Sequence, residues 1–453
     1  MSSRRRTPRL APEVRRRELL DAALDVILDR GFDALTVEAV ARRAGVTRPV
    51  VYDLFGDLDA LLLALIDREE AAALDPLLGI VGTHPGTGVT PEAFLVDAVG
   101  QFLGAVRARP RTWRFLLAPP RGASNELNTR IDRSRATVTG LVEALIDWGV
   151  DARGGPPGLD HGVLARLLVA AGEDAARLTL LHPRRFPAGR ITALAASGSL
   201  LIGVETSVRH LGPAPSVSIR GPLEQEAVGA PRARMAKSQR RVQILDAAVG
   251  LIAENGFEAL TMEAIARRVG VNRAVVYRSF ANLEILMLAM LRRLDAAVRD
   301  TFDAALPAEP SDRHPVRVLG EALATLLEAA MQAPDTWRVA LMRPERAPRA
   351  LQTLVNRRRA ALAKRLRPLM ASALESLADP APEMDVDLAA RLLLSTGEEQ
   401  ARLALEDPAF PTDRLIEASW TFLSALLPRT TQPPDGYEGA TLTSTDLPEP
   451  PSS

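Results

Sequence analysis

The side chains best suited to molecular recognition form two short clusters in this sequence. The first holds Thr47, Arg48, Pro49, Tyr52 and Asp53, and the second holds Asn272, Arg273, Ala274, Tyr277 and Arg278. A guanidinium group can bind guanine bidentately, an asparagine amide can bind adenine, and hydroxyl groups can bind phosphate oxygens. These residue types predict hydrogen bonding to nucleic acid rather than catalysis.

Both clusters belong to a longer internal repeat. With a constant offset of 225 and no gap, residues 20–55 match residues 245–280 at 22 of 36 positions. Ungapped agreement of this extent indicates a duplication, and a duplication decides the fold before any single element does. We therefore expect two similar units in one chain.

Each copy of the repeat predicts a helix, a tight turn and a second helix. Thr36 and its counterpart Thr261 can cap the first helix, whose apolar residues recur every three to four positions. Gly45 and Gly270 end it, because glycine readily adopts the left-handed conformation of a chain reversal. Thr47 is expected to cap the second helix. Such a pair leaves the outer face of the second helix free to enter a DNA major groove.

At these residues the chain resembles the TetR family of bacterial transcriptional regulators. The signature is an Ala-Gly-Val turn followed by Tyr-x-x-Phe, present at residues 44–55 and again at 269–280 with Val269 in place of the alanine. A Gly-Phe-x-Ala-Leu-Thr block at residues 31–36, and its counterpart at 256–261, belongs to the same pattern. The resemblance is specific over about the first 60 residues of each half. It implies an all-α fold with two units, each a three-helix head and a helical ligand and dimerisation body.

The resemblance also implies a function and a partner. Members of the family are transcriptional regulators that bind double-stranded DNA as two-fold dimers and leave it when a small effector binds. We therefore expect a repressor that forms an intramolecular pseudo-dimer, with residues 160–211 packed on residues 387–427, so that one monomeric chain occupies the operator. One departure weakens the match, because Leu58 and Leu283 stand where the family usually has a lysine that contacts a phosphate.

The repeat and the composition divide the chain into seven parts. These are a basic arm at 1–14, a first head at 15–60, a first body at 61–211, a linker at 212–238, a second head at 239–285, a second body at 286–427 and a disordered tail at 428–453. The linker is rich in Pro, Gly and Ala, and the tail is rich in Pro, Ser and Thr, which are compositions that do not build a packed core.

Positive charge is concentrated in the heads although the net charge of the chain is zero. Residues 1–55 hold eleven arginines against eight acidic residues, and residues 231–280 hold nine basic against four acidic residues. Basic arms can lie along phosphates or in a minor groove, and a solvated tail is the alternative. The arm residues that we assign to DNA are Arg15, Arg16, Arg17, Lys237, Arg240 and Arg241.

The two heads differ at the positions that would touch DNA. Asp53 would repel phosphates, whereas Arg278 at the matching position would attract them. We therefore expect an asymmetric operator, with the second head binding its half-site more tightly. Tyr52 and Tyr277 can either contact phosphates or belong to the core, whereas Phe55 and Phe280 are assigned to the core.

The bodies are expected to enclose an apolar effector pocket between helices. Trp113 with Arg114, and Trp337 with Arg338, are placed at the edge of such a pocket, and a core tryptophan beside a surface arginine is the alternative. The apolar composition of the bodies favours a hydrophobic, lipid-like or steroid-like effector. The effector itself is unknown.

Other classes of function find little support in the sequence. There is no cysteine, which fits a reducing cytoplasm, and the longest apolar run, residues 191–204, is too short for a bilayer of about 30 Å. The five histidines lack metal-ligand spacing, and neither Gly-x-Ser-x-Gly nor a phosphate-binding glycine loop occurs. We therefore expect no metal, no cofactor, no membrane and no enzyme. The remaining competitor is a helical protein-binding adaptor with vestigial heads.

Overall fold

The computed structural model describes residues 11–81, 88–117, 125–153, 155, 158–201, 214–215, 237–306, 313–342, 349–377 and 384–426. Within these ranges the regular structure is helical and contains no strand, so the all-α prediction is confirmed. Residues 1–10, nearly all of the predicted linker and the predicted tail lie outside the described part of the chain.

In the part of the first half that the structure describes there are nine α-helices, in an order that the second half repeats. They are α1 Pro12–Arg30, α2 Val37–Ala44, α3 Arg48–Phe55, α4 Leu58–Val81, α5 Pro91–Ala108, α6 Pro110–Leu117, α7 Asn125–Arg153, α8 His161–Leu181 and α9 Ala188–Leu201. The second half has α10 Lys237–Asn255, α11 Met262–Val269, α12 Arg273–Ser279, α13 Leu283–Ala305, α14 Pro315–Gln332, α15 Pro334–Ala340, α16 Arg349–Leu377, α17 Val386–Glu406 and α18 Thr412–Ala425. A single 3₁₀ turn, Phe32–Ala34 or Phe257–Ala259, follows α1 and α10.

Each head has a small core of its own. In the first head α1, α2 and α3 bury Leu19, Ala23, Ile27, Val40, Val51 and Phe55, and in the second α10, α11 and α12 bury Ile244, Ala248, Ile252, Ile265, Val276 and Phe280. Phe55 and Phe280 are therefore core residues, as predicted. Both cores extend into the body, since Phe115 of α6 completes the first and Val339 of α15 completes the second.

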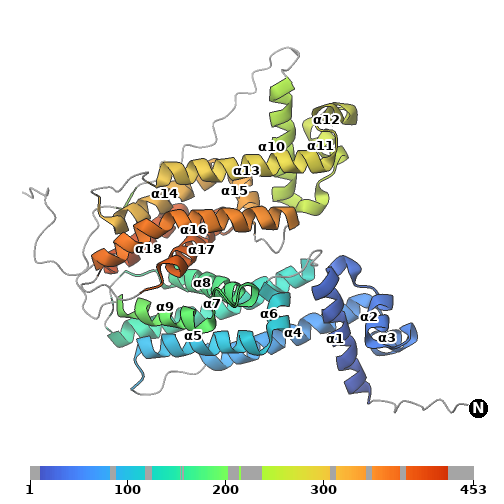
Figure 1. Ribbon diagram of the computed structural model, residues 1–453, viewed down its shortest axis with the longest axis horizontal. Coiled ribbons are helices and arrows are strands. Elements are labelled where there is room, and N and C mark those ends of the chain that lie inside the picture. The colour runs from blue at the N-terminus through green and yellow to red at the C-terminus, as the bar shows by residue number, and fades with distance from the viewer. Residues whose placement is uncertain are drawn as a thin grey trace, which may run out of the picture.

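The two bodies pack against each other, and both heads lie at the same end of the molecule (Figure 1). Helix α8 contacts α17 and α18, and α9 contacts α17. At the two edges of this contact, Arg414 of α18 binds Asp160, the N-cap of α8, and Arg190 of α9 binds Asp385, the N-cap of α17. The paired bonds have the reciprocity of a two-fold interface, here within one chain.

The centre of the interface contains buried charge. Asp174 of α8 accepts hydrogen bonds from Arg359 of α16 at 3.1 Å and from Ser395 of α17 at 2.8 Å. Burial by itself would raise the pKa of Asp174, but Arg359 and Arg177 outweigh it and hold that pKa below its ordinary value. The carboxylate is therefore charged and paired across the two halves.

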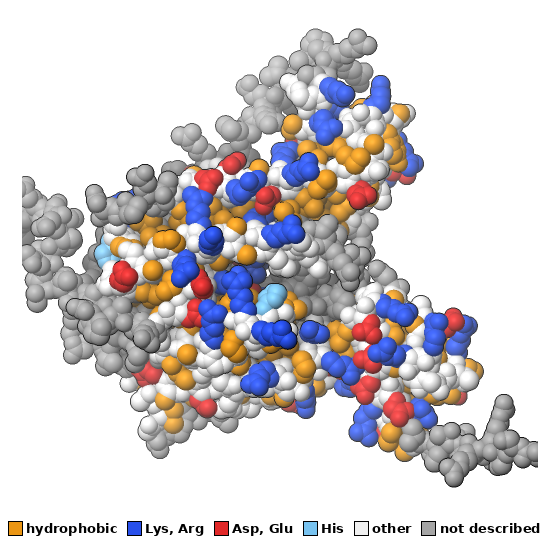
Figure 2. Space-filling model, in the orientation of Figure 1, with side chains coloured by type: hydrophobic (Ala, Val, Ile, Leu, Met, Phe, Trp, Pro, Cys, Tyr) orange, Lys and Arg blue, Asp and Glu red, His pale blue; other side chains and the backbone are white. Residues whose placement is uncertain are grey.

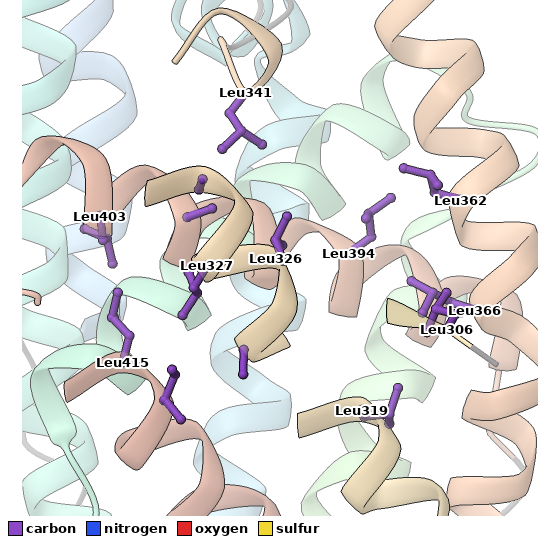
Figure 3. Close-up of a cluster of buried hydrophobic side chains, with 14 of the residues drawn as sticks. Leu306, Leu319, Leu326, Leu327, Leu341, Leu362, Leu366, Leu394, Leu403 and Leu415 are labelled. Atoms are coloured by element: carbon purple, nitrogen blue, oxygen red, sulfur yellow. The ribbon is translucent and has the colours of Figure 1, made fainter. Parts of the chain in front are cut away.

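The largest apolar core lies in the second body. Leucines from α13 to α18 converge there, among them Leu306, Leu327, Leu362, Leu394 and Leu415 (Figure 3). The first body has two smaller clusters, one around Leu103 and Phe186 and one around Val106 and Trp113. The two bodies thus share an order of helices but differ in how densely their interiors are filled.

No single helix in the described ranges is long and apolar enough to cross a membrane. One bent pair, α12 with α13, meets the criteria of length and composition only when its two helices are taken together across a bend of 61°.

Candidate DNA-binding interface and body cavity

The first helix of each helix-turn-helix is fixed at both ends by local hydrogen bonds. The hydroxyl of Thr36 accepts from the backbone N–H of Ala39 at 3.0 Å, and Thr261 accepts from Ala264 at the same distance. The turns that follow contain Gly45 at φ 66° and Gly270 at φ 71°, the left-handed conformation that favours glycine. Both the caps and the glycine turns are as predicted.

The second helix begins differently in the two heads. Thr47 occupies the N-cap position of α3, but its side chain makes no capping hydrogen bond, so the prediction that Thr47 caps this helix through its side chain is wrong. Asn272 does cap α12, because its Oδ1 accepts from the N–H of Ala274 at 2.9 Å. Bidentate recognition of adenine uses both the Oδ1 and the N–H₂ group of an asparagine. In Asn272 the Oδ1 already accepts the capping bond, so only the N–H₂ group is outside the cap.

All twelve residues assigned to DNA contact are exposed. They are Thr36, Thr47, Arg48, Pro49, Tyr52 and Asp53 in the first head and Thr261, Asn272, Arg273, Ala274, Tyr277 and Arg278 in the second. Tyr52 is 50% exposed and Tyr277 is 40% exposed, so the core alternative for these tyrosines is excluded. Exposure leaves their role in DNA contact as a prediction.

The two arginines nearest the start of the recognition helices have different partners. Arg48 forms an ion pair with Glu38 of α2 at 2.5 Å, whereas Arg273 binds the hydroxyl of Tyr277 at 3.1 Å. An exposed ion pair contributes about 0–1 kcal/mol, so Arg48 has to give up a small stabilisation before it can contact a base. Arg273 does not have to leave a carboxylate.

The six residues assigned to basic arms lie in α1 and α10, so their placement in arms is wrong. Arg16 donates to the carbonyl of Leu54 at 2.9 Å and stacks on Phe55, and Arg241 likewise binds the carbonyl of Ser279 and stacks on Phe280. In each head, the two contacts of this arginine, one with a backbone carbonyl and one with a phenylalanine ring, hold the end of the recognition helix against the first helix of the head. The other four remain on the helix surfaces, where Arg15 pairs with Glu18, Arg240 binds Gln243, and Arg17 and Lys237 are exposed.

The surface charge of the heads is unequal on the face shown in Figure 2. Lys and Arg side chains predominate over α10 to α12, whereas acidic and basic side chains alternate over α1 to α3. Leu58 and Leu283, which stand where the family has a lysine, instead pack against the two head cores.

A cavity of about 780 Å³ lies within the bodies. Its wall is mainly apolar, and the charged side chains in it are Glu70, Glu92, Arg130, Arg135 and Glu173. Trp113 lines it, as predicted, and meets Phe102 edge to face with ring centroids 5.4 Å apart. The other three pocket predictions are wrong: Arg114 is exposed, Trp337 is buried in the second body core, and Arg338 binds Asp335 and the carbonyl of Leu405.

Sequence reasoning missed the charged residues that connect this cavity to the head. Arg135 binds Glu173 bidentately, and Glu173 outweighs burial to place the pKa of Arg135 above its ordinary value. Arg177 bonds to Glu173 and also donates to the carbonyl of Leu117, at the end of α6, at 3.0 Å. In the second half, Arg402 likewise donates a hydrogen bond to the carbonyl of Leu341, just after α15, at 3.1 Å. The pattern Gly-Glu-x-x-x-Arg occurs in both α8 and α17, and this repetition was the sequence signal that could have identified Glu173 and Arg177.

Helix α6 joins the cavity to the first head. Trp113, Leu116 and Leu117 line the cavity, whereas Phe115 is buried in the head core and Arg111 binds the carbonyl of Asp21 in α1 at 3.2 Å. A change in the cavity wall therefore has a direct contact path to α1.

Two exposed helix-turn-helix heads on helical bodies define a DNA-binding transcriptional regulator. Sequence comparison identifies the group. The profile described as "Bacterial regulatory proteins, tetR family" matches residues 19–65 and again 244–290, and the profile "Tetracyclin repressor-like, C-terminal domain" matches residues 91–198. The chain belongs to the TetR family and carries two of its units in tandem.

Individual relatives agree with this assignment. The transcriptional activator FasR of Mycolicibacterium smegmatis is 29% identical over 182 residues, which cover 40% of this chain and 78% of FasR. The regulator BetI of Rhizobium meliloti is 35% identical over 97 residues, 21% of this chain and 46% of BetI. A TetR-like regulator from Rhodococcus sp. RHA1, of known structure, is 28% identical, with 42% of this chain and 96% of that chain covered and a TM-score of 0.35. FasR and BetI are named as regulators, and as a member of the TetR family this chain is a regulator rather than an enzyme.

Proposed function

We propose that this chain is an effector-controlled repressor in which one polypeptide binds an operator with two unequal half-sites. The observation that carries the proposal is the pair of exposed recognition helices, α3 and α12, at the same end of one molecule and with different side chains. Linking two heads makes the second contact intramolecular, with an effective concentration in roughly the millimolar range. One chain then does the work of a dimer, and it does so in the cytoplasm, where the DNA lies.

The difference between the heads supports an asymmetric operator. Arg278 of α12 stands where α3 has Asp53, and Arg273 is not held by a carboxylate as Arg48 is by Glu38. Both differences favour tighter binding of DNA by the second head. The half-site of the first head would contribute mainly specificity and a response to the effector.

The cavity supports control by an apolar effector. A molecule that fills the space beside Trp113 and Leu117 pushes against α6, whose Phe115 is packed in the head core. A shift of α6 then moves α1 and with it α3. An effector changes DNA affinity only by as much as it prefers one position of the heads over the other.

Binding of the purified full-length chain to the DNA upstream of its own gene tests the proposal. Fluorescence anisotropy should show binding that weakens steeply between about 50 mM and 200 mM salt, and Arg273→Ala should weaken it by about 1–3 kcal/mol. Sedimentation of the complex should give one chain per operator. A selected site that is a symmetric palindrome would contradict the two unequal half-sites, and two chains per operator would contradict the one-chain arrangement.

The direction of regulation needs a separate measurement, because FasR is named an activator. Transcription from the bound promoter in a purified system should fall when the chain is added. A rise would exclude repression while leaving DNA binding intact. Lack of any salt-dependent DNA binding would leave the adaptor as the better explanation.

A further inference from the structure

The cavity is continuous across the boundary between the two halves. In the first half its wall comes from all six body helices, α4 to α9, and in the second half from α13, α14, α16, α17 and α18. Leu167 of α8 and Leu392 of α17, which occupy matching positions, both line it. Because α8 and α17 pack against each other, a molecule in this cavity contacts both halves at their interface.

The two ends of the cavity differ in width. Three pairs of matching positions line it, namely Leu95 with Leu319, Phe102 with Leu326 and Val142 with Leu366. The members in the first half are half-buried, whereas Leu319, Leu326 and Leu366 are 9%, 6% and 5% exposed. The wide part therefore lies in the first body, and a narrower extension enters the second.

An indole accounts for part of this difference. Trp420 of α18 lies so close to Gly320 of α14 that a Cβ at Gly320 would be 2.5 Å from the indole ring. The matching residues of the first body are Val96 and Ala196, which place no large ring between their helices. Trp420 thus adds core volume to the second body that the first body lacks.

Four charged residues of the wall, Glu70, Arg130, Arg135 and Glu173, lie against opposite charges. Arg135 is bound to Glu173, and Arg130 is bound to Asp67 with Glu70 close by at 3.7 Å. The remaining wall is formed mainly by aliphatic and aromatic side chains. An uncharged ligand suits such a wall, because a charged one would lose its hydration without gaining an unpaired counter-ion.

We infer that the chain binds a single elongated, uncharged and largely apolar molecule, with its bulk in the first body and one end across the interface in the second. The inference rests on the proposed function only in treating this molecule as the effector. Because α6 lines the cavity and α15 does not, the ligand contacts the helix that supports the first head but not its counterpart under the second. The expected ratio is one ligand per chain, not one per body.

Titration of the full chain without DNA tests the ratio. We would use 1-dodecanol and 1-hexanol as neutral probes of two lengths, with native mass spectrometry for stoichiometry and tryptophan fluorescence for affinity. One dodecanol per chain is expected. Two independent dodecanol sites, or no saturable binding of dodecanol, would overturn the inference.

A matched pair of substitutions tests whether the bulk of the ligand lies in the first body and only one end of it in the second. Ala98 of α5 and Ala322 of α14 occupy matching positions and both line the cavity. Ala98→Trp should lower the affinity for both alcohols by about tenfold or more, which corresponds to lost burial of roughly two methylene groups. Ala322→Trp should lower the affinity for dodecanol by a similar factor and leave the affinity for hexanol within about twofold of the parent value. Equal effects of the two variants on both probes would contradict an unequal cavity.

Two further measurements keep the outcomes distinct. Ala98→Leu and Ala322→Leu repeat the comparison with smaller side chains, and circular dichroism verifies that each variant is folded. Anisotropy with operator DNA is then measured with and without dodecanol. A one-to-one complex that leaves DNA affinity unchanged would keep the binding site and refute only its role as an effector site.

Discussion

Arg414 binds the carboxylate of Asp160 through two hydrogen bonds of 2.6 and 3.0 Å, although 254 residues separate the two along the chain. Asp160 also caps α8, since its Oδ1 accepts from the N–H of Val163 at 3.0 Å. The same carboxylate therefore caps the start of α8 in the first body and holds α18 of the second body. Arg190 and Asp385 repeat the relationship at the other edge.

Removal of this contact should loosen the two bodies. In a double-mutant cycle of Asp160→Ala and Arg414→Ala, measured by urea unfolding, we expect a coupling free energy of about 0.5–1 kcal/mol, because the pair is partly exposed. Asp160→Ala alone should cost about 1 kcal/mol more through the lost cap. Glu417→Ala, an exposed acid on α18, is the control, and a coupling near zero would show that this ion pair does not hold the bodies together.

Acid should weaken the interface through Asp174. Its pKa in the folded chain lies below the ordinary value, so the stabilisation is fully present above about pH 4 and is lost as the pH falls through the folded pKa. The contribution of Asp174 to the free energy of unfolding should therefore stay level above about pH 5 and decline below about pH 4. Asp174→Asn should lower stability at neutral pH by about 3–5 kcal/mol and reduce this acid dependence. Asp53→Asn, on the head surface, should do neither.

The two recognition helices should respond differently to loss of their N-cap side chains. Asn272→Ala removes an observed capping bond and should cost about 1 kcal/mol of stability. Thr47→Ala removes none and should stay within about 0.5 kcal/mol of the parent. Both values come from urea unfolding monitored by circular dichroism. A larger loss for Thr47→Ala would mean that the threonine stabilises α3 in another way.

The tryptophans should report ligand binding unequally. Trp113 lines the cavity and Trp337 does not, so Trp113→Phe should reduce the fluorescence change caused by dodecanol while Trp337→Phe leaves it intact. Some signal should persist in Trp113→Phe, because Trp148 also lines the cavity. An equal loss in both variants would show that the change arises from a general loosening of the bodies.

Exchange of charge between the heads should change the salt dependence of DNA binding in opposite directions. Asp53→Arg places a cation where the first head has a carboxylate, and it should steepen the slope of log affinity against log salt by about 0.9 for one added phosphate contact. Arg278→Asp should flatten the slope by a similar amount. Titrations on one operator at several salt concentrations give both slopes. If neither substitution changes the slope, these positions lie away from the phosphates.

The sequence by itself determined the heads, the order of helices and the membership of the family. Thr36, Gly45 and Phe55 could be assigned from sequence because caps, turns and helical periodicity depend on residues only a few positions apart. The repeat then carried each assignment to the second copy. The same reasoning failed for Thr47, since a residue type favoured at an N-cap need not make the bond.

Only the tertiary structure decided how differently the two bodies are filled and which side chains hold them together. Arg16 and Arg241 could be taken for arm residues until the folded heads placed them on Phe55 and Phe280. The bond from Arg414 to Asp160 and the position of the cavity depend on contacts between distant segments and on the fit of side chains. No local pattern encodes those contacts, because packing is a property of the assembled interior and not of the sequence around any one residue.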